Sequence, residues 1–220
     1  MIKSETFNFL NDLAANNNRD WFLVNKGRHD DARINVLEFA GEVITGLSKF
    51  DHTIPSGLDP KDCVMRIYRD VRFSKEKTPY KNNFGAGFSQ NGKKFNGPGY
   101  YLHIHPEGSF IAGGCWLPEA DLLKAIRQEI DYNGSDFRAI IEDPSFIKYY
   151  GKPESEYKLK TCPKGYDSDH PEIEYLKLKS FTFSHMLSRA ELTNSGAVEQ
   201  VVNGFAKLNP FIAFLRNAIS

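Results

Sequence analysis

The sequence lacks the features that mark several classes of protein. It has no run of about 18 apolar residues, so a transmembrane helix is not expected. Its first residues are polar and charged where a secretion signal needs an apolar stretch, so we expect no such signal. The three cysteines lie far apart, which argues against a disulfide framework or a zinc ribbon and favours a reducing, cytoplasmic location.

An excess of charge of either sign is also missing. Lys and Arg number 28 and Asp and Glu number 28, so the formal net charge is zero. Wholesale coating of nucleic acid or anionic lipid is therefore disfavoured. The sequence contains no G-x-S-x-G, G-x-x-x-x-G-K-[ST] or H-E-x-x-H motif. Sequence alone thus names no reaction and no cofactor, and leaves open whether the protein is an enzyme.

What is present is typical of a folded chain with helices at both ends. Apolar residues recur at helical spacing after Ser4, around Trp21, and from about Asp30 to Ser48, so the first 50 residues are predicted to be helical. From Cys63 the apolar period changes to two, which predicts β-strands in an antiparallel meander. The expected strands cover residues 63–73, 84–89, 100–105 and 109–116.

The last hundred residues are predicted to be helical and mixed. Helices are expected from Pro118, around Phe137 and from Val198, with a strand over residues 176–183. Helices flanking a mainly antiparallel central sheet give an α+β fold. We interpret residues 1–220 as a single domain with a helical part (1–50), a sheet core (62–117) and a C-terminal part (118–220).

A basic block lies in the middle of this neutral chain. Residues 61–94 hold nine Lys or Arg against three Asp or Glu, a net charge of +6. Because side chains alternate along a strand, four residues of the strand expected at 63–73 share its polar face: Arg66, Tyr68, Asp70 and Arg72. Arginine pairs suit planar anions, since each guanidinium meets two carboxylate or phosphate oxygens at once.

The loop after this strand is expected to bring Lys77, Tyr80 and Lys81 close to its end. Asp70 could there orient an arginine, accept a proton or bind a metal. A structural alternative stays open, in which the arginines and Asp70 form a salt-bridge network that supports the strand. Arg69, which falls on the apolar face, would then be a buried arginine paired with a carboxylate elsewhere.

The strand expected at 100–105 places Tyr101, His103 and His105 on one face. Two histidines at this spacing can reach one metal ion, but no cluster supplies a third ligand, so a metal site is disfavoured. A role for His103 as a proton donor or an anion contact is the more plausible one.

The segment Arg66-Ile-Tyr-Arg69-Asp70-Val-Arg72-Phe73, with Lys77 and Tyr80 after it, resembles the RxxRDxRF…KxxY signature of domain-of-unknown-function family 2461, a bacterial family also found in fungi. Further similarity lies in residues 16–26, 99–104, 113–118, 163–166 and 169–171. The resemblance covers essentially the whole chain and implies one domain without an established activity. It implies that the charged and aromatic residues of the signature act as a unit, and that Arg19 and Trp21 help to line it. The chain departs from the family pattern at His29 and at His105, which weakens a metal site further.

Three functions are compatible with these observations. In the favoured one, Arg66, Arg72 and Lys77 bind a small anionic, phosphate-bearing ligand, while Arg69, Tyr80 and Tyr101 complete the site and Asp70 or His103 moves a proton.

The second function is a nucleic-acid-binding module that uses the same basic strand and loop, with Tyr68, Tyr80 and Tyr101 as stacking platforms. The third is a non-catalytic interaction module, in which Arg66, Asp70 and Arg72 are buried and mutually paired. No membrane partner is expected.

Overall fold

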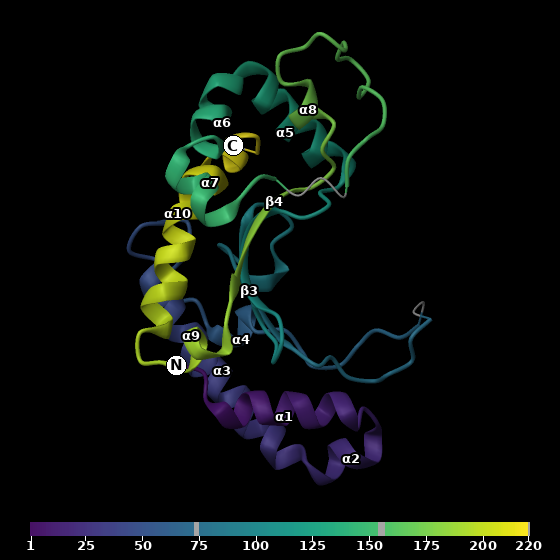
Figure 1. The fold of residues 1–220 in the computed structure, drawn as a ribbon, viewed down its shortest axis with the longest axis vertical. Coiled ribbons are helices and arrows are strands. Elements are labelled where there is room, and N and C mark those ends of the chain that lie inside the picture. Colours follow the sequence, from purple (N-terminus) through teal and green to yellow (C-terminus); the bar gives the residue numbers. More distant parts are fainter. Residues whose placement is uncertain (73–74, 154–156, 220) are drawn as a thin grey trace. The chain divides into compact units, whose positions relative to one another are not determined.

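The computed structural model describes residues 1–72, 75–153 and 157–219 and shows an α+β protein (Figure 1). The α+β prediction is confirmed. The helices within these ranges are α1 (Ser4–Ala15), α2 (Arg19–Val24), α3 (Lys26–Leu47), α4 (Pro60–Cys63), α5 (Ala120–Tyr132), α6 (Gly134–Ile141), α7 (Pro144–Tyr150), α8 (Ile173–Leu176), α9 (Arg189–Thr193) and α10 (Ala197–Asn217), with a 3-10 turn η1 (Gly92–Lys94). The strands are β1 (Phe84–Phe88), β2 (Gly99–Ile104), β3 (Ser109–Cys115) and β4 (Phe181–Leu187).

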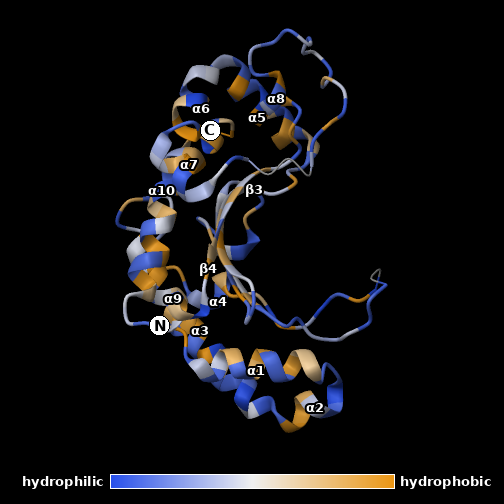
Figure 2. Ribbon diagram, in the orientation of Figure 1, coloured by the Kyte–Doolittle hydropathy of each residue, from blue (hydrophilic) through white to orange (hydrophobic). Residues whose placement is uncertain are grey.

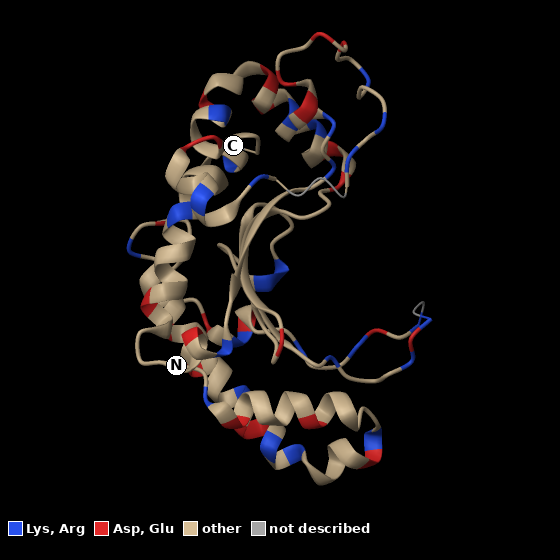
Figure 3. Ribbon diagram, viewed as in Figure 1, with Lys and Arg blue, Asp and Glu red and all other residues tan. Residues whose placement is uncertain are grey.

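The four strands form one antiparallel sheet in the order β1-β2-β3-β4. None of them carries a Lys, Arg, Asp or Glu, so the sheet is uncharged in Figure 3. Burial alternates along β2: Tyr100 and Leu102 are buried, whereas Tyr101 and His103 are half-buried. One face of β2 therefore belongs to the core and the other carries polar aromatic side chains.

The chain divides into two compact units. The first comprises residues 1–95, 101–111 and 186–204, and the second comprises residues 96–100, 112–185 and 205–220. Strands β2, β3 and β4 each contribute residues to both units. The interpretation of the whole chain as a single domain stays a prediction.

The first unit has a helical core in which α1 and α3 bury their apolar faces, including Phe7, Leu10 and Val43. Both helices alternate hydrophobic and hydrophilic residues along their length, as Figure 2 shows. The buried Asn35 of α3 holds the start of α1, because its Oδ1 accepts hydrogen bonds from Lys3 N (2.8 Å) and Thr6 Oγ1 (3.0 Å).

The second unit has an aromatic core that α6, α7, α10 and β4 supply. The rings of Phe146 and Phe183 meet edge to face at 4.8 Å, and Phe183 meets Phe211 in the same way at 4.9 Å. Gly114 lets β3 pass close to β4, since its φ is +127° and a Cβ there would lie 1.9 Å from the carbonyl oxygen of Phe181.

Two of the predicted strands are wrong. Residues 64–72 form no regular strand, and their β-pairing with other described segments consists of two isolated bridges, Val64 with Ala86 and Tyr68 with Tyr80. Pro79 lies opposite Arg69 and has no N–H, so the second hydrogen bond of that pair cannot form. Phe73, the last residue of the predicted strand, lies outside the described residues.

The strand expected over residues 176–183 begins later in the structure. Helix α8 ends at Leu176, and β4 starts only at Phe181. Of the four strands of the meander predicted from Cys63 to residue 116, the last three are confirmed as β1 to β3, whereas the fourth strand of the observed sheet comes from the C-terminal part. Within the described ranges, no helix has the length and apolar character needed to cross a membrane.

Candidate functional site: the basic hairpin

The signature-like segment forms an irregular β-hairpin in the first unit. Its arms are joined by hydrogen bonds from Arg69 N to Pro79 O (3.0 Å) and from Lys81 N to Ile67 O (2.8 Å). We call residues 66–72 and 75–81 the basic hairpin; Figure 1 shows it extending from the sheet, and Figure 3 shows charges of both signs on it.

Tyr80 anchors the basic hairpin to the helices. Its ring is 5% exposed and stacks on Phe22 of α2, with centroids 4.0 Å apart and an interplanar angle of 14°. The Asn17 side chain holds the backbone of the same residue: its Nδ2 donates to Tyr80 O (3.0 Å), and Tyr80 N donates to its Oδ1 (3.1 Å). Burial raises the pKa of the Tyr80 hydroxyl, and the charge of Arg19 opposes this rise.

Asn17 is a residue of this site that sequence reasoning missed. It lies within the run Asn16-Asn17-Asn18, which belongs to a segment that resembles the family pattern. Nothing in the local sequence shows that its amide faces a backbone 63 residues away.

Asp70 and Arg72 form a two-point ion pair on the surface. Arg72 Nε donates to Asp70 Oδ1 (2.9 Å) and Nη2 donates to Oδ2 (2.6 Å). The side chains are 45% and 77% exposed, respectively. These hydrogen bonds, a backbone bond from Arg72 and the charge of Arg66 hold the pKa of Asp70 below its usual range. Asp70 is therefore an ionised acceptor that orients Arg72.

Arg69 and Lys77 stabilise the loop itself. Arg69 Nη1 lies 2.8 Å from Glu76 Oε2 and donates to Thr78 Oγ1 (3.0 Å). Arg69 thus has a carboxylate partner, but this partner lies within the same loop, and the side chain is half-buried (28% exposed) rather than buried as the structural alternative had it. Lys77 Nζ donates to Val71 O (2.9 Å), so its ammonium group closes the loop.

Arg66 differs from these residues because it has no counter-ion. It is exposed, and it makes no ion pair or side-chain hydrogen bond with any residue in the described ranges. Its charge acts on Asp70 and on Lys81. Burial, and then the charge of Arg66, lowers the pKa of the half-buried Lys81. Positive charge at this end of the basic hairpin is therefore only partly compensated.

The structural alternative required Arg66, Asp70 and Arg72 to be buried and mutually paired. All three are exposed, and only Asp70 and Arg72 pair with each other. Exposed ion pairs contribute little to stability, since water screens them and two long side chains lose freedom. A buried salt-bridge network is therefore the wrong description of this cluster.

Tyr101 and His103 form a separate group on β2. His103 Nδ1 lies 3.1 Å from Tyr101 Oη and 3.4 Å from Asn83 Nδ2, and its ring stacks on Phe110 with centroids 4.7 Å apart. A Cβ at Gly85 would lie 2.6 Å from Tyr101 Oη, so only glycine lets this side chain cross β1.

Burial, and then the charge of His105, lowers the pKa of His103 to about 4. The imidazole is thus neutral near pH 7, where Nδ1 accepts hydrogen bonds. Asn83, which contacts His103, lies two residues after the end of the basic hairpin in the chain.

Trp21 is linked to the Tyr80 stack through Phe9, whose ring also meets Phe22 at 6.5 Å. The Trp21 ring packs against Phe9 at 6.2 Å, and the guanidinium of Arg28 lies 6.0 Å from its centroid. Arg19, on the same helix, is close enough for its charge to act on Tyr80. In the part of the chain that the structure describes, no group of three or more His, Cys, Asp or Glu is arranged to hold a metal ion.

Together, these features define an α+β protein with an uncharged antiparallel sheet and an exposed basic hairpin. The comparison with family models assigns the chain to a family within this class. The chain belongs to the family described as "Conserved hypothetical protein (DUF2461)", whose model matches residues 5–214. The resemblance noted in the sequence is thereby confirmed. No curated protein and no solved structure matches the chain.

Proposed function

We propose that the protein binds a small anionic, phosphate-bearing ligand at the basic hairpin. The observation that carries the proposal is the exposed Arg66, which has no counter-ion among the described residues although it lies beside Lys81. A guanidinium offers a planar fork of donors that matches two phosphate oxygens. A bound phosphate would neutralise the positive charge of Arg66, for which the described residues provide no counter-ion.

The contacts around Arg66 support binding, because they hold the basic hairpin in place before a ligand binds. Asn17 holds Tyr80, and the contact of Arg69 with Glu76 closes the loop. A binding site whose backbone is already ordered loses less entropy when a ligand arrives. Asp70 holds Arg72 in place beside the site, and the proposal assigns it no proton transfer.

Ribose 5-phosphate is a suitable first probe, since it carries a phosphate without a base. We expect it to raise the melting temperature of the wild type, because a ligand that binds only the folded state stabilises it by mass action. Arg66→Ala is expected to weaken binding by about tenfold or more, as the loss of a charge-assisted hydrogen bond does. Lys94→Ala is the matched control, since Lys94 is an exposed cation of the same basic block.

Two outcomes would contradict the proposal. One is that neither ribose 5-phosphate nor pyrophosphate changes the melting temperature at low salt. The other is that Arg66→Ala and Lys94→Ala weaken binding equally, which would show a general effect of positive charge.

A second candidate function is binding of single-stranded nucleic acid. It is favoured by Tyr68, whose ring is 52% exposed next to Arg66 and offers a stacking surface for a base. Tyr80, expected as a second platform, is buried under Phe22 and cannot take that role. Affinity for a short oligonucleotide that falls steeply with salt and is lost in Tyr68→Ala would support this function.

We also propose a cytoplasmic location. Cys63, Cys115 and Cys162 are free thiols. Burial raises the pKa of Cys63 to about 12 and that of Cys115 to about 11, so both stay protonated and unreactive. Free cysteines of this kind are typical of a reducing compartment.

A further inference from the structure

Three aromatic rings gather where α2 meets the basic hairpin, and only one of them is exposed. The Tyr68 ring lies 6.1 Å from the ring of Phe22 and 5.5 Å from that of Tyr80, measured between centroids. Phe22 and Tyr80 are 3% and 5% exposed, whereas Tyr68 is 52% exposed. The two buried rings therefore hold Tyr68 in place, and its outer surface is open to a ligand.

Two exposed arginines adjoin this cluster, one from each element. Arg66 and Tyr68 flank the buried Ile67, so both point away from the core, and their Cα atoms are at most about 7 Å apart. Arg19 is the first residue of α2, and its charge acts on the Tyr80 hydroxyl. Neither arginine makes an ion pair or a side-chain hydrogen bond with any residue in the described ranges.

Nearby carboxylates do not cancel the charge of these two arginines. Asp70 is bound at both oxygens by Arg72. Asp20, next to one of the arginines in the chain, is a second carboxylate, and the half-buried Lys81, on which the charge of Arg66 acts, is a further cation. Four cations are thus set against these two carboxylates, so the surface around the exposed ring is positive.

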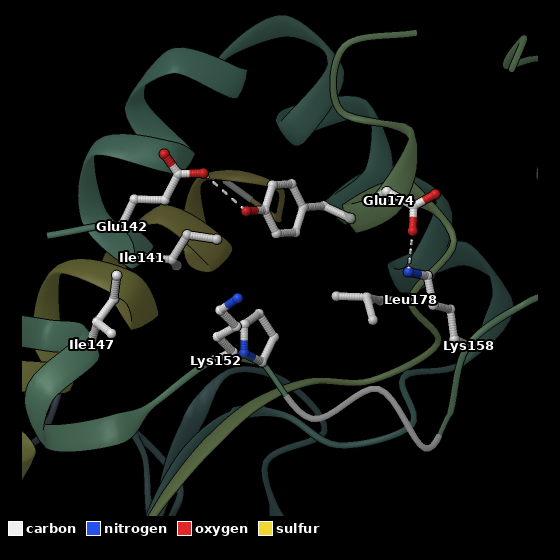
Figure 4. A pocket seen from close by; sticks show the side chains of 9 residues that line it. Ile141, Glu142, Ile147, Lys152, Lys158, Glu174 and Leu178 are labelled. Carbon is white, nitrogen blue, oxygen red and sulfur yellow. Dashed lines mark hydrogen bonds and ion pairs between the residues drawn. The ribbon is translucent and has the colours of Figure 1, made fainter. Parts of the chain in front are cut away.

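A cavity in the second unit shows a different balance of charge. Its volume is about 600 Å³, and the end of α6, helices α7 and α8, and the chain around Lys152 line it (Figure 4). Its described lining holds two lysines, Lys152 and Lys158, and two glutamates, Glu142 and Glu174. Because these charges are equal in number, they favour neither an anion nor a cation, in contrast to the charges at the basic hairpin.

We infer that the ligand of the basic hairpin is a nucleoside monophosphate, whose base stacks on Tyr68 and whose phosphate binds Arg66 and Arg19. The inference rests on the proposed function and narrows it to phosphates that carry a planar ring. Aromatic side chains stack on any base through its π-face, and arginine forks match phosphate oxygens. Tyr68 is the one exposed ring among the described residues of the basic hairpin, so it can stack a single base. A mononucleotide therefore fits this surface better than a longer strand.

The test compares adenosine 5′-monophosphate (AMP) with ribose 5-phosphate, which lacks the base. Titration calorimetry at a fixed salt concentration gives the affinity of each probe. We expect AMP to bind about tenfold more tightly, because stacking on one aromatic side chain contributes on that scale. Tyr68→Ala should remove this advantage and leave the affinity for ribose 5-phosphate unchanged, whereas Tyr68→Phe, which keeps the ring, should retain it.

NMR signals of the adenine protons report on stacking directly. They should move upfield when AMP binds the wild type, because the ring current of Tyr68 shields them, and this shift should be absent with Tyr68→Ala. Tyr132→Ala is the matched control, since Tyr132 is 72% exposed at the end of α5 and lies outside the basic hairpin. Arg19→Ala should weaken both probes about tenfold, as is expected of Arg66→Ala, because each removes a charge-assisted hydrogen bond to the phosphate.

Each failure has a distinct pattern. If ribose 5-phosphate binds and AMP binds no more tightly, or if Tyr68→Ala and Tyr132→Ala behave alike, the nucleotide inference is overturned and the phosphate site stands. If neither probe binds, both are overturned. Tighter binding of a short oligoadenylate than of AMP, compared per nucleotide at the same salt concentration, overturns the inference in favour of a nucleic-acid site.

Discussion

His103 is expected to make the protein less stable in mild acid. In the folded chain its pKa is lowered to about 4 by burial, from an ordinary value of 6.5. Between these values the unfolded chain binds a proton that the folded chain does not. The free energy of unfolding therefore falls as the pH falls from 6.5 to 4.

The size of this effect follows from the pKa difference. At about 1.4 kcal/mol for each pKa unit, the interval from 6.5 to about 4 gives an upper limit of about 3.5 kcal/mol. The ring is half-buried, and water screens part of the interaction, so about 2 kcal/mol is expected. The loss is complete only below the folded pKa.

Two measurements check this prediction. Urea unfolding between pH 7.5 and 4 should show a smaller loss of stability for His103→Gln than for the wild type, while His52→Gln, at an exposed histidine, should leave the pH dependence largely unchanged. Imidazole NMR signals, assigned with the same variants, give the pKa of His103 directly. A midpoint at pH 6 or above would refute the reasoning.

Three further substitutions have defined outcomes. Asn17→Ala removes both hydrogen bonds to the Tyr80 backbone and should lower the free energy of unfolding by about 1–2 kcal/mol, measured with urea; an unchanged value would show that the hairpin is anchored by ring stacking alone. Gly114→Ala places a Cβ against Phe181 O at a positive φ and should cost more than about 3 kcal/mol; a melting temperature equal to that of the wild type would contradict this close approach. Asp70→Asn should leave the melting temperature nearly unchanged because the pair with Arg72 is exposed, whereas a large drop would return the arginines to a structural role.

Local pattern was sufficient for much of the fold and for the outward face of the basic hairpin. Alternation with period two correctly placed β1, β2 and β3, since a half-buried strand must alternate its side chains. The same alternation correctly assigned Arg66, Tyr68 and Asp70 to an exposed face. That result depends only on side-chain direction along an extended chain, and it holds although no regular strand forms there.

Tertiary structure alone decided what each of these side chains contacts. Residues 66–72 pair with residues 75–81 in a hairpin and do not join the sheet as a strand. Pro79 lies opposite Arg69 and has no N–H, so a regular ladder of hydrogen bonds cannot form there. The contact of Asn17 with Tyr80 joins residues that are far apart in the sequence, so no local pattern predicts it. The same holds for the cavity that Lys152 lines, because separate segments form its wall.

Periodicity describes the neighbours of a residue within a few positions along the chain. An ion pair, a stacked ring or a cavity forms between segments that only folding brings together. Sequence could therefore place Arg66 on the surface, but only the folded chain shows that Arg72 has a carboxylate partner and that Arg66 has none among the described residues.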